Sequence, residues 1–350
     1  MGKKPLVSIL MPMLNSMPFL NERLETILAQ TFYDWELIVV DSYSNDGSWE
    51  LIKSYANNDP RIKTHQAPKD GIYPALNKCL EFAQGEYIYI AMSDDTMAPN
   101  CLEKMITVLY EYDDCDVCHC CLQIIDQNGN HHKNTSWKNF LAQKYLGDLI
   151  DKKHIRIAPI NGILYSGLGT VYSSMTQLLI RKKIFNEIGL FRDDWGSYSD
   201  FEWGMRISFI YNTIHIPYYL ATFRKHSNQS TPQEIDKIDN LNKKIEMIKE
   251  AYKVFQNISP EYKNSINLSD LCRFYTDDIT KEMILCQKNF QKKLFICIRV
   301  FFTKPILLVE LFWDRLIKKI MLDNSILLTR HIKIDRMIKK FKLENNIIIL

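Results

Sequence analysis

Three short polar segments hold most of the side chains in this sequence that could do chemistry. They are Pro12-Met13-Leu14-Asn15, Asp41 to Gly47, and Ser93-Asp94-Asp95-Thr96. Adjacent carboxylates suit a hard divalent cation, and such a cation can bridge the oxygens of a diphosphate. Without a cation, a carboxylate pair would repel a diphosphate. The residue types therefore favour a site where a metal ion helps to bind a polyphosphate.

Each polar segment directly follows a predicted buried strand. Strands are expected at 6–11, 36–40 and 87–92, with a short strand near 62–65. Amphipathic helices are expected at about 19–30, 48–56 and 75–83. Alternation of strands and helices at this spacing predicts a parallel, doubly wound sheet with helices on both faces. Ligands of such sheets bind at the carboxyl ends of the strands, so the three segments should converge there.

Taken singly, these segments also have simpler structural interpretations. Asn45 to Ser48 could form only a turn and a helix N-cap, and Asp94-Asp95 only a loop. Their position after successive strands favours one shared site. Neither G-x-G-x-x-G nor G-x-x-x-x-G-K-[ST] follows any of these strands. That argues against a dinucleotide-binding dehydrogenase and a P-loop nucleotidase.

The motifs and their order resemble a family 2 glycosyltransferase of the bacterial polysaccharide or glycoconjugate type. The similar blocks cover roughly residues 5 to 230: 7–15, 30–48, 70–78, 83–88, 93–95, 179–185, 188–191, 199–206 and 224–226. The resemblance implies an α/β fold of the GT-A type, a doubly wound, mostly parallel sheet flanked by helices. A helical C-terminal extension would follow it.

The resemblance also implies a reaction and a set of ligands. The donor would be a nucleoside-diphosphate sugar, with UDP or dTDP as the nucleotide, and its sugar would move to an acceptor hydroxyl with inversion at the anomeric carbon. Asp41 would bind the base and Asp94 the ribose or sugar, while Asp95 would ligate Mg²⁺ or Mn²⁺ on the diphosphate. His226 would complete the metal shell. The remaining donor contacts that it implies are Pro12, Asn15, Asp70 and Arg224.

Asp200 takes the catalytic base position in this comparison. Inversion by direct displacement needs a carboxylate that removes the proton of the acceptor hydroxyl. A helix is predicted over 199–209, so Asp200 would lie in its first turn, where the helix dipole favours the ionised form. The alternative is that Asp200 and Glu202 only decorate a helix N-terminus. Glu202 and Trp203 are expected to contact the acceptor, with a core position as the alternative for Trp203.

Three positions depart from the usual pattern of the family. Ser42 stands where a second Asp commonly follows Asp41, and Pro74 stands where an Asp is common. Ser199 replaces a common Glu before Asp200. The first two weaken the expected donor contacts, and the third leaves the expected base in place.

Two segments between residues 115 and 169 have competing interpretations. Cys115, Cys118, Cys120 and Cys121 with His119 have a spacing that lacks the separated second ligand pair of a zinc site. A buried strand over about 116–124 is favoured instead. Further on, where the resemblance fades, the glycines between 162 and 169 predict a flexible segment that shapes the acceptor pocket.

Charge is distributed unevenly along the 350 residues, whose formal net charge is +3. Residues 281–350 hold 15 Lys+Arg against 6 Asp+Glu, a charge of +9, which leaves −6 for the first 280. Helices are expected at 233–256, at 269–287 and from 290 onward. An apolar stripe at helical spacing includes Ile306, Val309 and Trp313. One interpretation is a helix pair lying on an anionic membrane surface; the other is packing on the catalytic domain or on a second subunit.

These patterns predict the organisation of the chain and its location. We expect a GT-A catalytic domain over 1–230, with a nucleotide-sugar-binding half at 5–125 and an acceptor half at 126–230, followed by a helical region over 231–350. No run of about 18 uncharged apolar residues occurs and no secretory signal is recognisable, so a cytoplasmic protein is expected, with the inner face of the membrane as a docking surface. Nine cysteines without an export signal fit that compartment.

Two other classes of function compete with an enzyme that acts on a carbohydrate or lipid-linked acceptor. A catalytically silent sugar- or nucleotide-binding scaffold would explain the departures at Ser42 and Ser199. A sugar nucleotidyltransferase would show a glycine-rich loop with a basic residue after the first strand, which is missing after Met11. Nucleic acid is not expected as a partner, because the basic tail interleaves with aliphatic rather than stacking aromatic residues.

Overall fold

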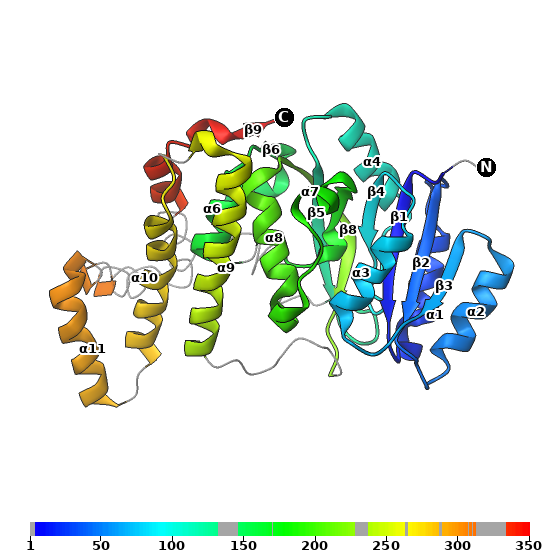
Figure 1. The fold of residues 1–350 in the computed structure, drawn as a ribbon, viewed down its shortest axis with the longest axis horizontal. Coiled ribbons are helices and arrows are strands. Elements are labelled where there is room, and N and C mark those ends of the chain that lie inside the picture. Colours follow the sequence, from blue (N-terminus) through cyan, green and yellow to red (C-terminus); the bar gives the residue numbers. More distant parts are fainter. Residues whose placement is uncertain are drawn as a thin grey trace.

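A mixed sheet runs through the centre of the molecule (Figure 1). The computed structural model describes residues 4–131, 146–169, 171–227, 237–262, 265–286, 289–306, 308–309, 311–312 and 334–350. Within these residues the sheet has nine strands in the order β3-β2-β1-β4-β7-β5-β8-β6-β9. Their bounds are β1 Val7–Met13, β2 Trp35–Asp41, β3 Ile62–Gln66, β4 Tyr87–Ile90, β5 Val117–Ile125, β6 His154–Arg156, β7 Leu178–Arg181, β8 Thr213–Arg224 and β9 Ile347–Ile349.

The N-terminal half is parallel and confirms the predicted strands. β1 pairs in parallel with β2 and β4, and β2 pairs in parallel with β3. Every residue of β1 and β2 is buried, which is the pattern of parallel strands covered on both faces. The helices that alternate with them are α1 Met17–Leu28, α2 Ser48–Asn58 and α3 Ile72–Phe82.

The second half of the sheet is mixed in direction. β7 is antiparallel to both β4 and β5, and β5 is parallel to β8. β6 is antiparallel to β8 and β9. The sheet therefore has fewer parallel pairs than predicted. One reason is that β7 lies between β4 and β5 and is antiparallel to both. The helices here are α4 Cys101–Glu111, α6 Ile160–Leu168, α7 Lys183–Ile188 and α8 Ser199–Ile210.

The glycine segment predicted to be flexible is the buried helix α6. Its Gly162 lies so close to α8 that a Cβ atom there would be 2.2 Å from Cγ of Phe209. That glycine lets two helices approach each other closely. The prediction of flexibility was wrong because the glycine is used for packing and not for a loop.

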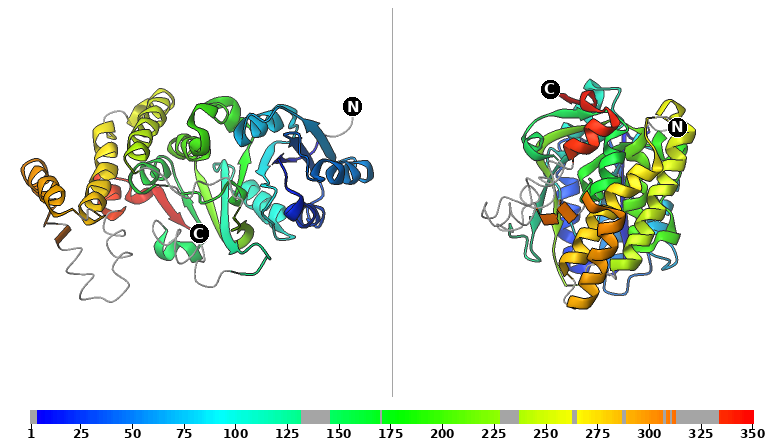
Figure 2. Two further views of the ribbon diagram at one scale, coloured as in Figure 1. Left: turned by 90° about the horizontal axis from the view of Figure 1, so that it is seen from below. Right: turned by 90° about the vertical axis from the view of Figure 1, so that its left-hand side faces the viewer.

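The C-terminal region is helical, as predicted, but its end returns to the sheet. Its helices are α9 Lys237–Ile258, α10 Leu268–Cys286 and α11 Phe290–Thr303. Figures 1 and 2 show them leading away from the sheet to α11 at one end of the molecule. β9 then pairs with β6, a contact that was not predicted. Among the described residues, no helix is long and apolar enough to cross a membrane. Of the apolar stripe proposed from the sequence, Trp313 lies outside the described residues.

Candidate functional site

Hydrogen bonds join the three polar segments that were predicted to converge. The Asn15 N–H donates to Oγ of Ser44 at 2.8 Å, and the Asn45 N–H donates to Oδ1 of Asn15 at 3.0 Å. The hydroxyls of Ser16 and Ser93 lie 2.7 Å apart. The loops after β1, β2 and β4 therefore form one connected edge. Asn15 belongs to this edge, as expected.

Asp41, the expected base-binding residue, is the last residue of β2 and is fully buried. Its carboxylate accepts hydrogen bonds from the Ser44 N–H at 3.1 Å, from the Ser44 hydroxyl at 2.5 Å and from Nε2 of Gln66 at 3.1 Å. These donors fix the carboxylate at the sheet edge. Sequence reasoning did not single out Ser44, which lies three residues after Asp41, or Gln66, which reaches Asp41 through the pairing of β2 with β3.

The same edge holds two residues with positive φ angles that are not glycine. They are Asn15 at φ 50° and Tyr43 at φ 58°. Such a backbone is costly for a bulky residue and tends to persist at functional sites. The Tyr43 side chain is 61% exposed beside the buried Asp41. An aromatic ring presented in this way can stack on a flat base.

The end of β8 brings Arg224 and His226 to the carboxylates after β4. Oδ1 of Asp95 accepts the Arg224 N–H at 2.9 Å, and Nε2 of His226 lies 3.0 Å from Oδ2 of Asp94. Asp95 is only 2% exposed. Burial and the neighbouring Asp94 carboxylate raise the pKa of Asp95 above its usual range. Two crowded carboxylates of this kind are stabilised by a positive charge.

Asp94, Asp95 and His226 are the side chains at this edge that could contribute ligands to a divalent cation held mainly by a diphosphate. Among the residues that the structure describes, no three His, Cys, Asp or Glu side chains are arranged as a ready-made metal centre. Mg²⁺ in phosphate-binding sites commonly uses only one or two carboxylates, with phosphate oxygens and water completing its shell. Asp94 and Asp95 could supply carboxylates of that kind, and His226 lies beside them.

The Arg224 guanidinium was expected to bind a phosphate, but all of its nitrogens hydrogen-bond to the protein. Nε donates to the Asp94 carbonyl at 2.7 Å, and Nη2 lies 2.6 Å from Oε2 of Glu22. Nη1 donates to the carbonyls of Asp126 and Gln127, both at 3.3 Å. The residue is 1% exposed. The expected donor contact is therefore replaced by a structural role.

Asp200, the expected base, lies in the first turn of α8. Its Oδ1 accepts the Phe201 N–H at 2.7 Å, and its carboxylate hydrogen-bonds the side chain of Tyr73 on α3. Burial raises the pKa of Asp200, and the hydrogen bonds from Phe201 and Tyr73 limit that rise. A partly desolvated carboxylate is a stronger base than an exposed one.

Helix α3 connects Asp200 to the donor edge. It begins directly after the loop that contains the exposed Asp70, another expected donor contact. That loop is attached to β2 by the Ala67 N–H, which donates to the Asp41 carbonyl at 3.0 Å. Sequence reasoning missed Tyr73, the residue that makes this connection.

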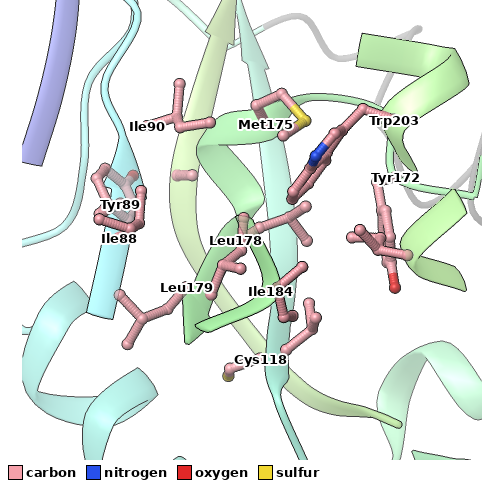
Figure 3. Close-up of a cluster of buried hydrophobic side chains, with 14 of the residues drawn as sticks. Ile88, Tyr89, Ile90, Cys118, Tyr172, Met175, Leu178, Leu179, Ile184 and Trp203 are labelled. Atoms are coloured by element: carbon pink, nitrogen blue, oxygen red, sulfur yellow. The ribbon is translucent and has the colours of Figure 1, made fainter. Parts of the chain in front are cut away.

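The two expected acceptor contacts on α8 are core residues instead. Trp203 is fully buried, stacks on Phe185 at 4.6 Å between ring centroids, and donates from Nε1 to the Gly189 carbonyl at 3.1 Å. Figure 3 shows its ring within a cluster of buried apolar side chains. Glu202 is also fully buried, and its carboxylate oxygens accept from Nε and Nη2 of Arg206 at 2.7 and 2.9 Å. Neither side chain can reach an acceptor in this structure. The i, i+4 spacing of Glu202 and Arg206 was the available signal.

Pro12, Ser42 and Ser199 make contacts within the protein that hold its strands and loops together. Pro12 is buried inside β1, where it pairs with Val40 of β2. The Ser42 N–H donates to the Met13 carbonyl at 2.8 Å, and the Ser199 hydroxyl donates to the Arg192 carbonyl. These serines tie loops together at two positions where the family commonly has an acidic residue.

Comparison of the sequence with known proteins identifies a family. Residues 8–189 match the family described as Glycosyl transferase family 2. The chain is 29% identical over 184 residues to Glycosyltransferase GlyG of Streptococcus pneumoniae, covering 52% of this chain and 59% of that protein. It is 35% identical over 109 residues to TuaG of Bacillus subtilis, covering 31% of this chain and 43% of that protein. The chain thus spans about half the length of these relatives.

The solved structures show the same fold at low sequence identity. S. aureus TarS 1–349 in complex with UDP-GlcNAc superposes with a TM-score of 0.58 at 15% identity. The match covers 96% of this chain and 90% of that chain. The similarity extends beyond residue 189 into the C-terminal helices, and it supports the predicted GT-A fold.

Proposed function

Because this chain belongs to glycosyl transferase family 2, we propose that it transfers a sugar from a nucleoside-diphosphate sugar to an acceptor hydroxyl with inversion at the anomeric carbon. The observation that carries the proposal is the edge whose loops hold Asp41, Asp94 and Asp95 and are joined by hydrogen bonds, with Tyr73 of α3 linking that edge to Asp200. A donor bound there would have its base next to Asp41, its diphosphate next to Asp94 and Asp95, and its reacting carbon next to Asp200.

The donor is proposed to be a UDP or dTDP sugar. Asp41 receives the base, with its carboxylate held by Ser44 and Gln66. Asp94 receives the ribose or the sugar, and the exposed Tyr43 ring provides a surface for the base. TarS, which has the same fold, has been crystallised with UDP-GlcNAc, and that supports a uridine nucleotide.

We propose that Asp94, Asp95 and His226 hold Mg²⁺ or Mn²⁺ with the diphosphate. A cation there offsets the negative charge that develops on the leaving nucleoside diphosphate. Arg224 holds the Asp95 carboxylate through its backbone N–H and the Asp94 backbone carbonyl through its Nε. Its guanidinium thereby positions the loop without touching the donor.

Asp200 is proposed as the base that takes the proton of the acceptor hydroxyl. Its raised pKa gives it a higher affinity for that proton, while Tyr73 and the Phe201 N–H keep the carboxylate oriented. The acceptor is a carbohydrate or a lipid-linked sugar, as in surface polysaccharide or glycoconjugate assembly. The name of TuaG assigns that relative to teichuronic acid biosynthesis, which supports a polysaccharide product. We place the enzyme in the cytoplasm, at the inner face of the membrane.

A thermal shift experiment tests the donor proposal. With Mn²⁺ present, UDP or dTDP at 100 times its Kd should stabilise the fold by about 2.7 kcal/mol, raising Tm by several degrees. Asp41→Asn should weaken this response, while Asp113→Asn, an exposed aspartate elsewhere, should leave it unchanged. If no nucleoside diphosphate raises Tm, the proposal is wrong.

A further inference from the structure

Helix α11 exposes large apolar side chains on one side. Their exposed fractions range from 48% for Leu294 to 78% for Phe302. We name the set the α11 apolar face; it consists of Phe290, Leu294, Phe295, Ile298, Phe301 and Phe302. An exposed apolar patch on this scale marks an interaction surface.

The positions of these residues around the helix form a defined pattern. At about 100° per residue, the six side chains fall within an arc of about 140°. Lys292 and Arg299 border the arc on one side, and Lys293 borders it on the other. The opposite side of α11 packs on the protein, since Val300 is buried with Ile284 of α10 in a small apolar cluster.

The surroundings of the α11 apolar face are positively charged. Residues 283–309 contain five Lys or Arg and no Asp or Glu. Lys304 forms an ion pair with Asp277 of α10. Lys292 and Arg299 are exposed at the edge of the face. The face thus combines apolar side chains with cations at its borders.

We propose that the α11 apolar face docks on a lipid bilayer that carries anionic headgroups. The helix would lie in the plane of the interface, with its phenylalanines at the acyl boundary and Lys292, Lys293 and Arg299 among the phosphates. A second copy of the same face would bring these cations against each other, so like charges disfavour self-association. The proposal rests on the proposed function for one point only, the benefit of holding the enzyme near a lipid-linked acceptor.

The position of α11 in the molecule is compatible with docking during catalysis. In two views α11 lies at one end of the molecule and β1 to β3 lie toward the other (Figures 1 and 2). A bilayer in contact with α11 would therefore leave the donor edge open to solvent.

Vesicle flotation of the full chain tests the docking. The protein should float with phosphatidylcholine–phosphatidylglycerol vesicles and not with phosphatidylcholine alone. Phe295→Ser with Phe302→Ser should lower the bound fraction about tenfold. Lys292→Gln with Arg299→Gln should lower it and weaken its dependence on salt. All four side chains are exposed, so these variants should keep the Tm of the parent chain.

Matched controls test whether vesicle binding depends on the α11 apolar face or only on the number of exposed rings and charges on the protein. Tyr33→Ser with Tyr110→Ser removes two exposed rings from the catalytic region, and Lys249→Gln with Lys253→Gln removes two exposed charges from α9. Both controls should float like the parent. Flotation of the Phe295→Ser/Phe302→Ser variant at the level of the parent would overturn the proposal.

Two further outcomes also decide the question. If the parent fails to bind anionic vesicles but sediments as a dimer that Phe295→Ser/Phe302→Ser converts to monomer, a second copy covers the face and the proposal is wrong. Absence of vesicle binding together with a normal response to nucleoside diphosphates overturns the docking alone. Vesicle binding without any nucleotide response overturns only the proposed function.

Discussion

Single residues in this chain obtain their chemistry from neighbours that are distant in sequence. The resemblance to the family implied that Asp41, Asp94, Asp95 and Asp200 are site residues, and the structure gives each of the four a defined set of contacts. The side chains that tune them could not be predicted, because Tyr73 reaches Asp200 only after α3 and α8 pack together. Trp203 was assigned to the acceptor because its type fits a sugar platform, but packing against Phe185 decides its position.

Removing the charge of Asp200 tests its assignment as base. Asp200→Asn should lower the rate of sugar transfer by about 10²- to 10⁴-fold, because no carboxylate is then present to take the proton of the acceptor hydroxyl. Donor affinity, measured by calorimetry, should stay within about twofold. Asp193→Asn, at an exposed position on the preceding turn, is the control and should keep full activity. A loss of donor affinity as large as the loss of transfer would show that Asp200 binds the donor instead.

The acid limb of the pH profile tests the contact between Tyr73 and Asp200. Burial raises the pKa of Asp200, so activity should be full above that pKa and fall as the pH decreases through it. The Tyr73 hydrogen bond stabilises the ionised carboxylate and lowers this pKa. Tyr73→Phe should therefore move the acid limb of kcat/KM to higher pH. An unchanged acid limb would contradict the role given to Tyr73.

Helices and strands were predicted well wherever their apolar pattern is local. The strands of the parallel half and the helices α1, α2 and α3 follow from continuous buried runs and helical spacing. β9 could not be predicted, because Ile347–Ile349 becomes a strand only by pairing with β6, nearly 200 residues earlier. α6 was missed because a glycine that serves close helix packing has the same sequence signal as a glycine in a loop.

A substitution at the contact between α6 and α8 tests how packing positions the base. Gly162→Ala places a Cβ atom 2.2 Å from Cγ of Phe209, so the helices must separate. Such overpacking costs about 1–3 kcal/mol, and the shift of α8 should lower kcat as well. Chemical denaturation and kinetics measure the two effects. Ser208→Ala on α8 is the control, because its buried hydroxyl has no hydrogen-bond partner and its loss should be neutral. Equal stability of Gly162→Ala and the parent would contradict the close packing.

At the scale of the whole molecule, β9 adds the last strand to one edge of the sheet, next to a buried basic cluster. β9 pairs with β6, which holds His154 and Arg156, and these two residues, His119 of β5 and His215 of β8 are all almost fully buried. Arg156 donates from Nη1 to Nε2 of His154 at 2.9 Å and from Nη2 to Nδ1 of His119 at 3.3 Å. These contacts require neutral imidazoles as acceptors. Burial and then Arg156 lower the pKa of His154 to about 2 and of His215 to about 3.

This cluster should make the fold sensitive to acid. The unfolded chain binds protons on these histidines below about pH 6.5, whereas the folded chain does not until about pH 3. The free energy of unfolding is therefore unaffected by the titration of these histidines above pH 6.5. As the pH falls below that value, it decreases by about 1.4 kcal/mol per pH unit for each histidine. Urea denaturation at pH 7, 6 and 5 measures the slope. His154→Gln should reduce it by about one proton; an identical slope would show that His154 does not titrate on unfolding.

Donor hydrolysis is the most direct test of the central claim, because it reports the donor without knowledge of the acceptor. With Mn²⁺, a panel of nucleoside-diphosphate sugars should show slow hydrolysis of one or a few uridine or thymidine donors. Chelation with EDTA and the substitution Asp95→Asn should each reduce this hydrolysis at least about tenfold. Hydrolysis of no donor in the panel, or hydrolysis that is unchanged by both EDTA and Asp95→Asn, would contradict a metal-assisted transfer at this edge of the sheet.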